Sequence, residues 1–203
     1  MDTLGILFGS LARVRLMRLF VFNPGNPLDV DDAARRSKVP PHLVRRELAI
    51  LAKAGLVKPR TFTREVAESG TTRRRRTKGF ILNGSFSHLS ALSSFLENMV
   101  PVKDTDIVKK LAGVGRLKFV VIAGVLVNDM DNRIDILIVG DAIKKALLER
   151  AIANIEAHLG RELRYAVFST YDFKYRLAMS DRFIRDVLHY PHSTVIDRFG
   201  ITA

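Results

Sequence analysis

The amino-acid sequence predicts an α+β protein in which helices and a β-hairpin come first and an α/β segment with a small mixed sheet follows. Apolar residues recur at the three- and four-residue spacing of helices through residues 1–54. After residue 113, two apolar runs, a helical pattern and an alternating run give the order strand, strand, helix, strand. Basic residues are concentrated in the first part: residues 1–83 carry 17 Lys and Arg against 7 Asp and Glu, and residues 84–203 carry 16 against 14.

This charge asymmetry, within a net charge of +12, indicates a polyanionic partner for the first part; the alternative is a soluble protein of generally high pI. The absence of cysteine excludes disulfides, thiolate zinc sites and cysteine nucleophiles. The longest apolar run, residues 119–127, is too short to cross a bilayer as a helix. The first residues also lack the order of a signal peptide. We therefore expect a cytoplasmic protein that does not contact a membrane.

Three helices are expected in the first part. An apolar stripe predicts a helix over residues 3–22, which the sequence NPGNP at residues 23–27 ends. Asp29 is a candidate N-cap for a short helix that runs to Ser37. The third helix, residues 41–54, begins with proline and is followed by Gly55 as its C-cap. His42, Arg45 and Arg46 fall on the side of this helix that is opposite its apolar residues.

A β-hairpin follows. Strands are predicted over residues 56–62 and 77–83, joined by a polar segment over residues 63–76. This segment ends with Arg73, Arg74, Arg75 and Arg76. The pattern therefore places the four arginines at the turn of the hairpin.

The stretch VPPHLVRRELAILAKAGLVKPR, residues 39–60, resembles the recognition helix and wing entry of a winged helix-turn-helix domain of bacterial and archaeal transcription regulators. The resemblance implies binding to double-stranded DNA. It implies that Arg45 and Arg46, assisted by His42, contact bases or flanking phosphates in the major groove. It also implies contacts to phosphates or the minor groove from the wing, namely Arg73, Arg74, Arg75, Arg76 and Lys78. Some winged helices bind protein instead, and the arginine run has the alternative interpretation of a solvated hairpin tip.

The rest of the chain is predicted as follows. A connecting helix spans residues 84–100 and packs either two protomers or the two parts of one chain together. Asp104 caps a further helix that runs to Leu111. Strands are expected over residues 117–127, 133–141 and 162–169, and helices over residues 142–159 and 172–189. The expected domains are therefore residues 1–83, the connecting helices 84–113, and residues 114–203.

Two stretches, VVIAGVLVNDMDNRIDILIVGD and GRELRYAVFSTYDFKYRL, resemble the minimal nucleotidyltransferase domain of the DNA polymerase β superfamily. In that family a Gly-Ser pair holds the triphosphate, and a Ser-Asp-x-Asp segment with a third carboxylate binds two Mg²⁺ ions. Here Val125 stands at the place of the serine and Arg133 at the place of the first carboxylate. Gly124, Asp135 and Glu162 remain, and Arg133 is expected to pair with Asp135 and repel a metal.

These features together predict a DNA-binding transcriptional regulator, a homodimer that carries an inactive, pseudoenzyme-like nucleotidyltransferase domain for dimerisation or effector sensing. We expect no catalytic residues, no metal site and no cofactor. One alternative is an active enzyme that transfers a nucleotidyl group from a nucleoside triphosphate to nucleic acid or protein. Another is a regulator that senses a nucleotide or small-molecule effector in a vestigial pocket, formed by Gly124, Arg133, Asp135 and Glu162.

Overall fold

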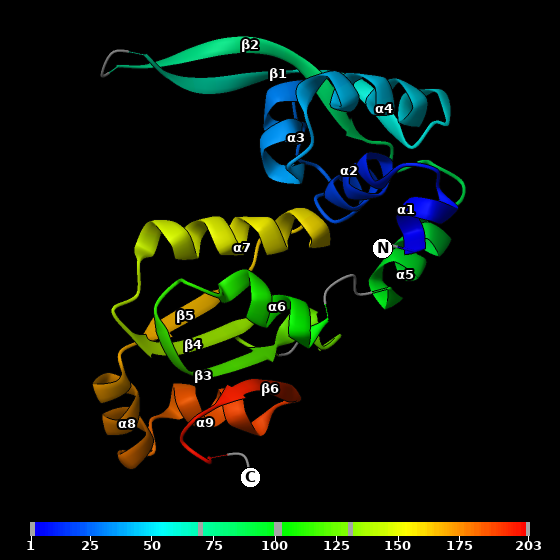
Figure 1. The fold of residues 1–203 in the computed structure, drawn as a ribbon. Helices are drawn as coiled ribbons and strands as arrows, with labels where there is room; N and C mark the ends of the chain where they lie inside the picture. Colours follow the sequence, from blue (N-terminus) through cyan, green and yellow to red (C-terminus); the bar gives the residue numbers. More distant parts are fainter. Residues whose placement is uncertain (1–2, 69–70, 100–102, 130–131, 202–203) are drawn as a thin grey trace. The chain divides into compact units, whose positions relative to one another are not determined.

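The computed structural model (Figure 1) describes residues 3–68, 71–99, 103–129 and 132–201. For the strand residues 65–68 and 71–73 it describes the backbone alone. The chain divides into two compact units: the first contains Met1–Leu96 and Glu156–Arg161, and the second contains Glu97–Ile155 and Glu162–Ala203. Each unit has its own sheet, of two strands in the first and of four in the second, within the described residues. The α+β class predicted from the sequence is confirmed at this level.

The first unit begins with α1 (Thr3–Leu7), α2 (Leu11–Val21), α3 (Val30–Ser37) and α4 (Pro41–Lys53). The prediction of one continuous helix over residues 3–22 is wrong, because the chain turns between α1 and α2. Gly9 adopts a φ of 69° there, a conformation that glycine reaches without a steric penalty. Ser10 then caps α2, its side-chain oxygen accepting a hydrogen bond from the Arg13 amide at 3.2 Å.

The residues predicted to begin α3 and to begin and end α4 are confirmed. The Asp29 side chain accepts a hydrogen bond from the Asp32 amide at 2.8 Å and so caps α3. Pro41 opens α4, and Gly55 follows it with a φ of 81°. The helices meet in one apolar core, whose fully buried members include Leu16, Leu19, Phe20, Ala33, Val44 and Leu48. This core fixes the side of α4 that faces inward.

The hairpin is longer than the sequence pattern suggests. β1 (Val57–Glu68) pairs antiparallel with β2 (Thr71–Leu82), and Thr63 lies opposite Arg76 in the register. The four arginines therefore lie within β2, and the prediction that they form the turn is wrong. Threonine recurs along both strands, with valine in β1 and isoleucine in β2, and these β-branched residues favour extended backbone. In Figure 1 the hairpin extends well beyond α3 and α4.

The base of the hairpin is joined to the loop before α3. Leu28 and Phe80 exchange two backbone hydrogen bonds of 2.9 Å, which form an isolated antiparallel bridge. Gly79 lies beside this bridge, and a Cβ atom there would overlap the Leu28 carbonyl and approach the Phe62 ring to 2.9 Å. Glycine is needed here because two backbone segments lie in close contact.

After α5 (Leu89–Asn98), the second unit contains a small mixed sheet, as the sequence predicts. The strand order is β5-β4-β3-β6, in which β3 pairs antiparallel with β4 and β6, and β4 pairs parallel with β5. The bounds are α6 Asp104–Leu111, β3 Arg116–Ala123, the 3-10 turn η1 Gly124–Leu126, β4 Ile136–Asp141, α7 Lys145–Leu159, β5 Tyr165–Phe168, α8 Thr170–Ala178, α9 Arg182–His189 and β6 His192–Asp197.

Several predicted boundaries in this unit are wrong. The first strand ends at Ala123, where the chain enters η1 instead of continuing to residue 127. The helix predicted over residues 172–189 is two helices, because Asp181 caps α9 with its carboxylate. Lys103, rather than Asp104, holds the N-cap position of α6. The sequence pattern does not predict β6.

One face of the four-stranded sheet packs against α8 and α9. Phe119 and Val121 of β3 contact Phe173 of α8 in a buried cluster, to which α9 contributes Ile184 and Val187. The Phe119 and Phe173 rings lie with their centroids 5.3 Å apart. In the described part of the chain, none of the helices has the length and apolar character needed to cross a membrane.

Gly79→Ala should destabilise the first unit by roughly 1–3 kcal/mol, because the added methyl group must displace the Leu28 carbonyl. The matched control is Gly84→Ala, where no atom lies within 4 Å of the added Cβ. Urea-induced unfolding followed by circular dichroism measures both. Equal midpoints for the two variants would contradict the close approach of the backbone at Gly79.

Candidate nucleic-acid interface

The outward face of α4 carries the residues that the sequence places there. His42, Arg45 and Arg46 are exposed, and Val44, Leu48 and Leu51 on the opposite side are buried. Residues three and four apart share a face of a helix, so the structure brings the three predicted side chains together. Arg45 makes no hydrogen bond or ion pair with any residue that the structure describes. Its guanidinium group is available to a ligand.

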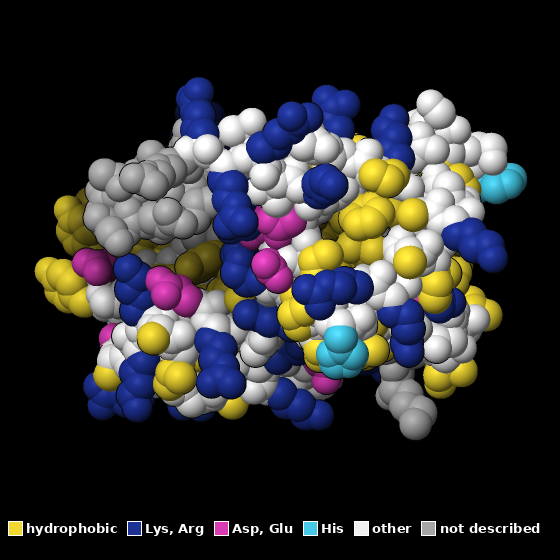
Figure 2. Space-filling model, turned by 90° about the horizontal axis from the view of Figure 1, so that it is seen from above, with side chains coloured by type: hydrophobic (Ala, Val, Ile, Leu, Met, Phe, Trp, Pro, Cys, Tyr) yellow, Lys and Arg dark blue, Asp and Glu magenta, His cyan; other side chains and the backbone are white. Residues whose placement is uncertain are grey.

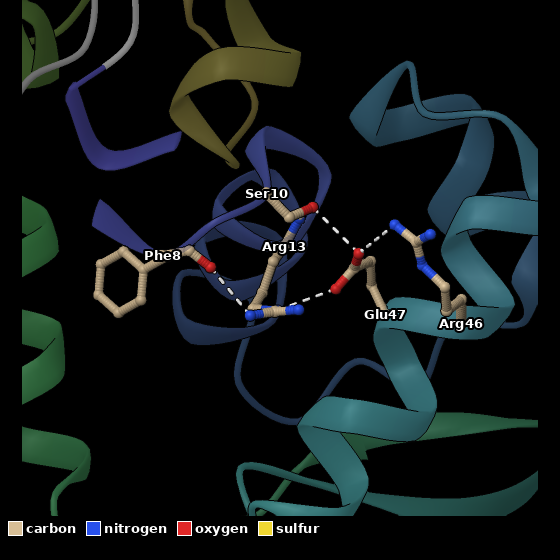
Figure 3. A network of polar contacts seen from close by, with 5 residues as sticks. All are labelled: Phe8, Ser10, Arg13, Arg46 and Glu47. Atoms are coloured by element: carbon tan, nitrogen blue, oxygen red, sulfur yellow. Dashed lines mark hydrogen bonds and ion pairs between the residues drawn. The ribbon is translucent and has the colours of Figure 1, made fainter. Parts of the chain in front are cut away.

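A buried carboxylate beneath this face was missed from the sequence. The side chain of Glu47 is fully buried and accepts three hydrogen bonds (Figure 3). Its Oε1 accepts from the Ser10 hydroxyl at 3.0 Å and from Arg46 at 2.9 Å, and its Oε2 accepts from Arg13 Nε at 2.9 Å. Arg13 also donates to the Phe8 carbonyl at 2.9 Å. The network joins the start of α2 to the middle of α4.

The sequence does contain a signal for this network. Glu47 lies three residues after Val44 and four before Leu51, which is a position on the apolar stripe of the helix. A charged residue at such a position is expected to have partners in the fold. Burial raises the pKa of Glu47, but the hydrogen bonds from Arg46, Arg13 and Ser10 outweigh this effect and hold the pKa below its ordinary value of 4.5. Arg46 is thus held by Glu47, whereas Arg45 is not.

The hairpin presents cations on both of its faces. Cross-strand partners share a face and successive residues alternate, so Arg74, Arg76 and Lys78 lie on one face and Arg75 on the other. Arg74, Arg75, Arg76 and Lys78 all have exposed side chains. The Arg73 backbone pairs with Val66, and its side chain lies outside the described residues. On the face seen in Figure 2, Lys and Arg side chains clearly outnumber Asp and Glu.

Another hairpin cation, Arg64, serves the fold. It lies opposite Arg75 in the register and forms ion pairs with Asp29 at 2.9 Å and Asp32 at 3.1 Å. These are the carboxylates at the N-terminal end of α3, where negative charge is also favoured by the helix dipole. The contact fastens the hairpin to α3. No local pattern in the sequence marks it, because the partners are more than thirty residues apart.

In the second unit, Gly124 and Asp135 lie together, as the vestigial pocket requires. Asp135 is buried, and its carboxylate accepts hydrogen bonds from the Val125 amide at 3.0 Å and the Arg164 amide at 2.7 Å. The Arg164 guanidinium forms an ion pair with the same carboxylate at 3.3 Å. A side chain at position 124 would overlap Asp135 Oδ1. The carboxylate is therefore occupied by contacts within the chain.

Two predictions about the other residues of that pocket are wrong. Arg133 pairs with Asp186 of α9 at 3.5 Å, so the expected pairing of Arg133 with Asp135 is wrong. Glu162 precedes β5, so its predicted place within the third strand is wrong. In the described ranges, no three His, Asp or Glu side chains lie close enough together to hold a metal ion.

The comparisons with known proteins add no family. No protein-family profile, curated protein or solved structure matches the chain.

Glu47→Gln should lower the stability of the first unit at pH 7 by roughly 1–3 kcal/mol, because a charged acceptor of three hydrogen bonds is removed. Since the pKa of Glu47 is lowered in the folded chain, its stabilising effect is complete above the unfolded value of 4.5 and is lost as the pH falls below it. Urea unfolding at pH 7 and pH 3.5 measures the difference between the two proteins. A difference that is the same at both pH values would contradict the ionised network.

Proposed function

We propose that the chain is a DNA-binding transcriptional regulator that uses α4 as a recognition helix and the β1–β2 hairpin as a wing. The observation that carries the proposal is the exposed set of cations within one compact unit: Arg45 and Arg46 on α4, and Arg74, Arg75, Arg76 and Lys78 on the hairpin. A helix with an outward basic face fits the major groove, and a basic hairpin fits the flanking phosphates.

The two arginines of α4 receive different roles in this proposal. Arg45 is exposed and has no partner in the described chain, so it can form the paired hydrogen bonds to guanine that arginine makes in the major groove. The side chain of Arg46 is 64% exposed, and it is oriented by its hydrogen bond to Glu47. A guanidinium held in place in this way loses less conformational entropy when it binds a phosphate. Arg45 therefore contributes to sequence choice and Arg46 mainly to affinity.

The wing contributes affinity without sequence choice. Its arginines alternate between the two faces of a two-stranded ribbon, so a hairpin lying in or along a groove can reach phosphates on both sides. Each phosphate that is neutralised releases condensed counterions from the DNA, and this makes the affinity strongly dependent on salt.

The proposal gives the second unit a binding role and no catalytic one. Two-metal nucleotidyl transfer needs carboxylate oxygens that are open to Mg²⁺. Both oxygens of Asp135 already accept hydrogen bonds from backbone amides, and Arg164 neutralises the charge. This arrangement disfavours catalysis at Asp135.

The homodimer is part of the same proposal. Apolar side chains of α1 and α5 are exposed: Ile6 by 67%, Leu7 by 68% and Phe95 by 38%. The ring of Phe95 lies against that of Phe8, with the centroids 6.4 Å apart. Beside them is a largely apolar hollow of about 590 Å³, lined in part by Phe8, Phe86 and Phe95. A second copy of the chain covers this surface and places two α4 helices on two half-sites.

Replacing Arg74, Arg75 and Arg76 together with glutamine should reduce the slope of log affinity against log salt by about 0.9 for each phosphate that is no longer neutralised, or about 2 to 3 in all. The DNA is a duplex recovered by selection from a random pool. The matched control replaces Lys144, Lys145 and Arg150, which are exposed in the second unit and carry the same total charge. The wing assignment is wrong if the two triple variants have the same slope as the unchanged protein.

Leu7→Glu and Phe95→Glu should each convert a dimer into a monomer, because they bury a carboxylate in an apolar interface. Both side chains are exposed in the single chain, so the variants should fold. Met179→Glu, at another exposed apolar side chain, is the control and should stay dimeric. Sedimentation equilibrium at micromolar concentration gives the masses. A monomeric unchanged protein would refute the dimer and leave the DNA assignment standing.

A further inference from the structure

The second unit contains a basic cavity that neither the DNA interface nor the Asp135 site uses. Its volume is about 420 Å³, and it lies between the C-terminal end of α6 and the strands β3 and β6. Val108 and Leu111 of α6 and Ile196 of β6 supply apolar walls, and Arg116, Lys118 and Arg198 supply positive charge. Asp135 lies at the other end of β3, where its backbone carbonyl accepts a hydrogen bond from the Ala123 amide. The two places are therefore separated by the length of the strand.

The pairing of β3 with the end of β6 places Lys118 beside Arg198. Val120 of β3 lies opposite Ile196 of β6, and the Arg198 amide donates to the Lys118 carbonyl at 2.9 Å. The β3–β4 register is irregular between Leu117 and Phe119, next to Lys118, and Arg198 directly follows the last residue of β6, Asp197. Arg116 lies two residues before Lys118, at the start of β3. Arg116 and Lys118 of β3 and Arg198, which follows β6, line the same cavity.

The two carboxylates near the cavity, those of Asp141 and Asp197, accept hydrogen bonds from other groups. Asp141, the cross-strand partner of Arg116, accepts hydrogen bonds from the Thr170 amide at 3.1 Å and the Thr170 hydroxyl at 2.7 Å. Asp197 accepts hydrogen bonds from three backbone amides of the turn that follows β6. Among the residues that the structure describes, none of the three cavity cations forms an ion pair with Asp or Glu. The pKa of Asp141 is lowered by its hydrogen bonds from Thr170 and also by the charges of Arg116 and Lys118. One carboxylate does not neutralise three cations, so the cavity keeps a net positive charge.

The chemistry of the cavity specifies that ligand. A hollow of a few hundred Å³ matches a small molecule and is too small for a duplex or a protein segment with its own core. Three cations exceed what one carboxylate neutralises, whereas a phosphomonoester carries a charge of about −2 and three strong acceptor oxygens. The apolar walls then accommodate the organic part of the molecule. We infer that this cavity binds a phosphorylated small molecule, with the phosphate held by Arg116, Lys118 and Arg198.

The test uses the full chain with Arg74, Arg75 and Arg76 replaced by glutamine, which removes the hairpin as a competing anion site. Phenyl phosphate is the probe, and benzoate is the matched carboxylate. Two-dimensional ¹H–¹⁵N NMR should show saturable shifts for the amides of Gly113, Gly115, Lys118 and Arg198 with phenyl phosphate. Benzoate should bind at least about tenfold more weakly, a difference of about 1.4 kcal/mol.

Variants complete the test. R116Q/K118Q should weaken the binding of phenyl phosphate at least about tenfold, because two charge-assisted hydrogen bonds are removed. R198Q removes the cation that follows β6 and should weaken the binding of phenyl phosphate as well. Arg150→Gln, at an exposed arginine of α7, should leave it unchanged. The inference is overturned if the shifts do not saturate, if benzoate binds equally well, or if Arg150→Gln has the same effect as R198Q.

Discussion

The arrangement of the first unit depends on the buried carboxylate of Glu47. A buried charge is costly unless hydrogen bonds and an opposite charge compensate for it. Here Ser10 and Arg13 from α2 and its cap, and Arg46 from α4 itself, supply both. Ser10 and Arg13 reach the Glu47 carboxylate only when α2 and α4 lie in this arrangement. The hydrogen bonds to Glu47 therefore select one position for α4. That position determines which face of the helix is buried and which carries Arg45.

At the hairpin, too, a charged side chain is held by partners of opposite charge, but here the central charge is positive. Arg64 is a cation held by two carboxylates at the start of α3, and the Leu28–Phe80 bridge fixes the backbone of the hairpin base. Arg75 lies opposite Arg64, one strand away, and is exposed. Arg64 of β1 thus stabilises the fold, while Arg74, Arg75, Arg76 and Lys78 of β2 are exposed. The number of arginines in a segment says little about ligand binding until their partners are known.

Local features of the fold could be predicted from the sequence, and features set by distant contacts could not. The cap at Asp29, the start at Pro41 and the exposed face of α4 follow from interactions within a few residues. β6 has no comparable signal, because its partner strand β3 lies far away in the sequence and its own residues are only half-buried. The polarity of the arginine run favours a turn, yet backbone hydrogen bonds between strands do not depend on side-chain polarity.

At the Asp135 site of the second unit, too, the contacts between distant residues could not be predicted from the sequence. The sequence indicates Gly124 and Asp135, but the contacts that occupy Asp135 come from the backbone of Val125 and Arg164. Any side chain at position 124 overlaps the carboxylate, and without the carboxylate two backbone amides lack their acceptor. The two positions therefore depend on each other for folding. In related sequences they should change as a pair, and their joint retention would not indicate a surviving enzyme.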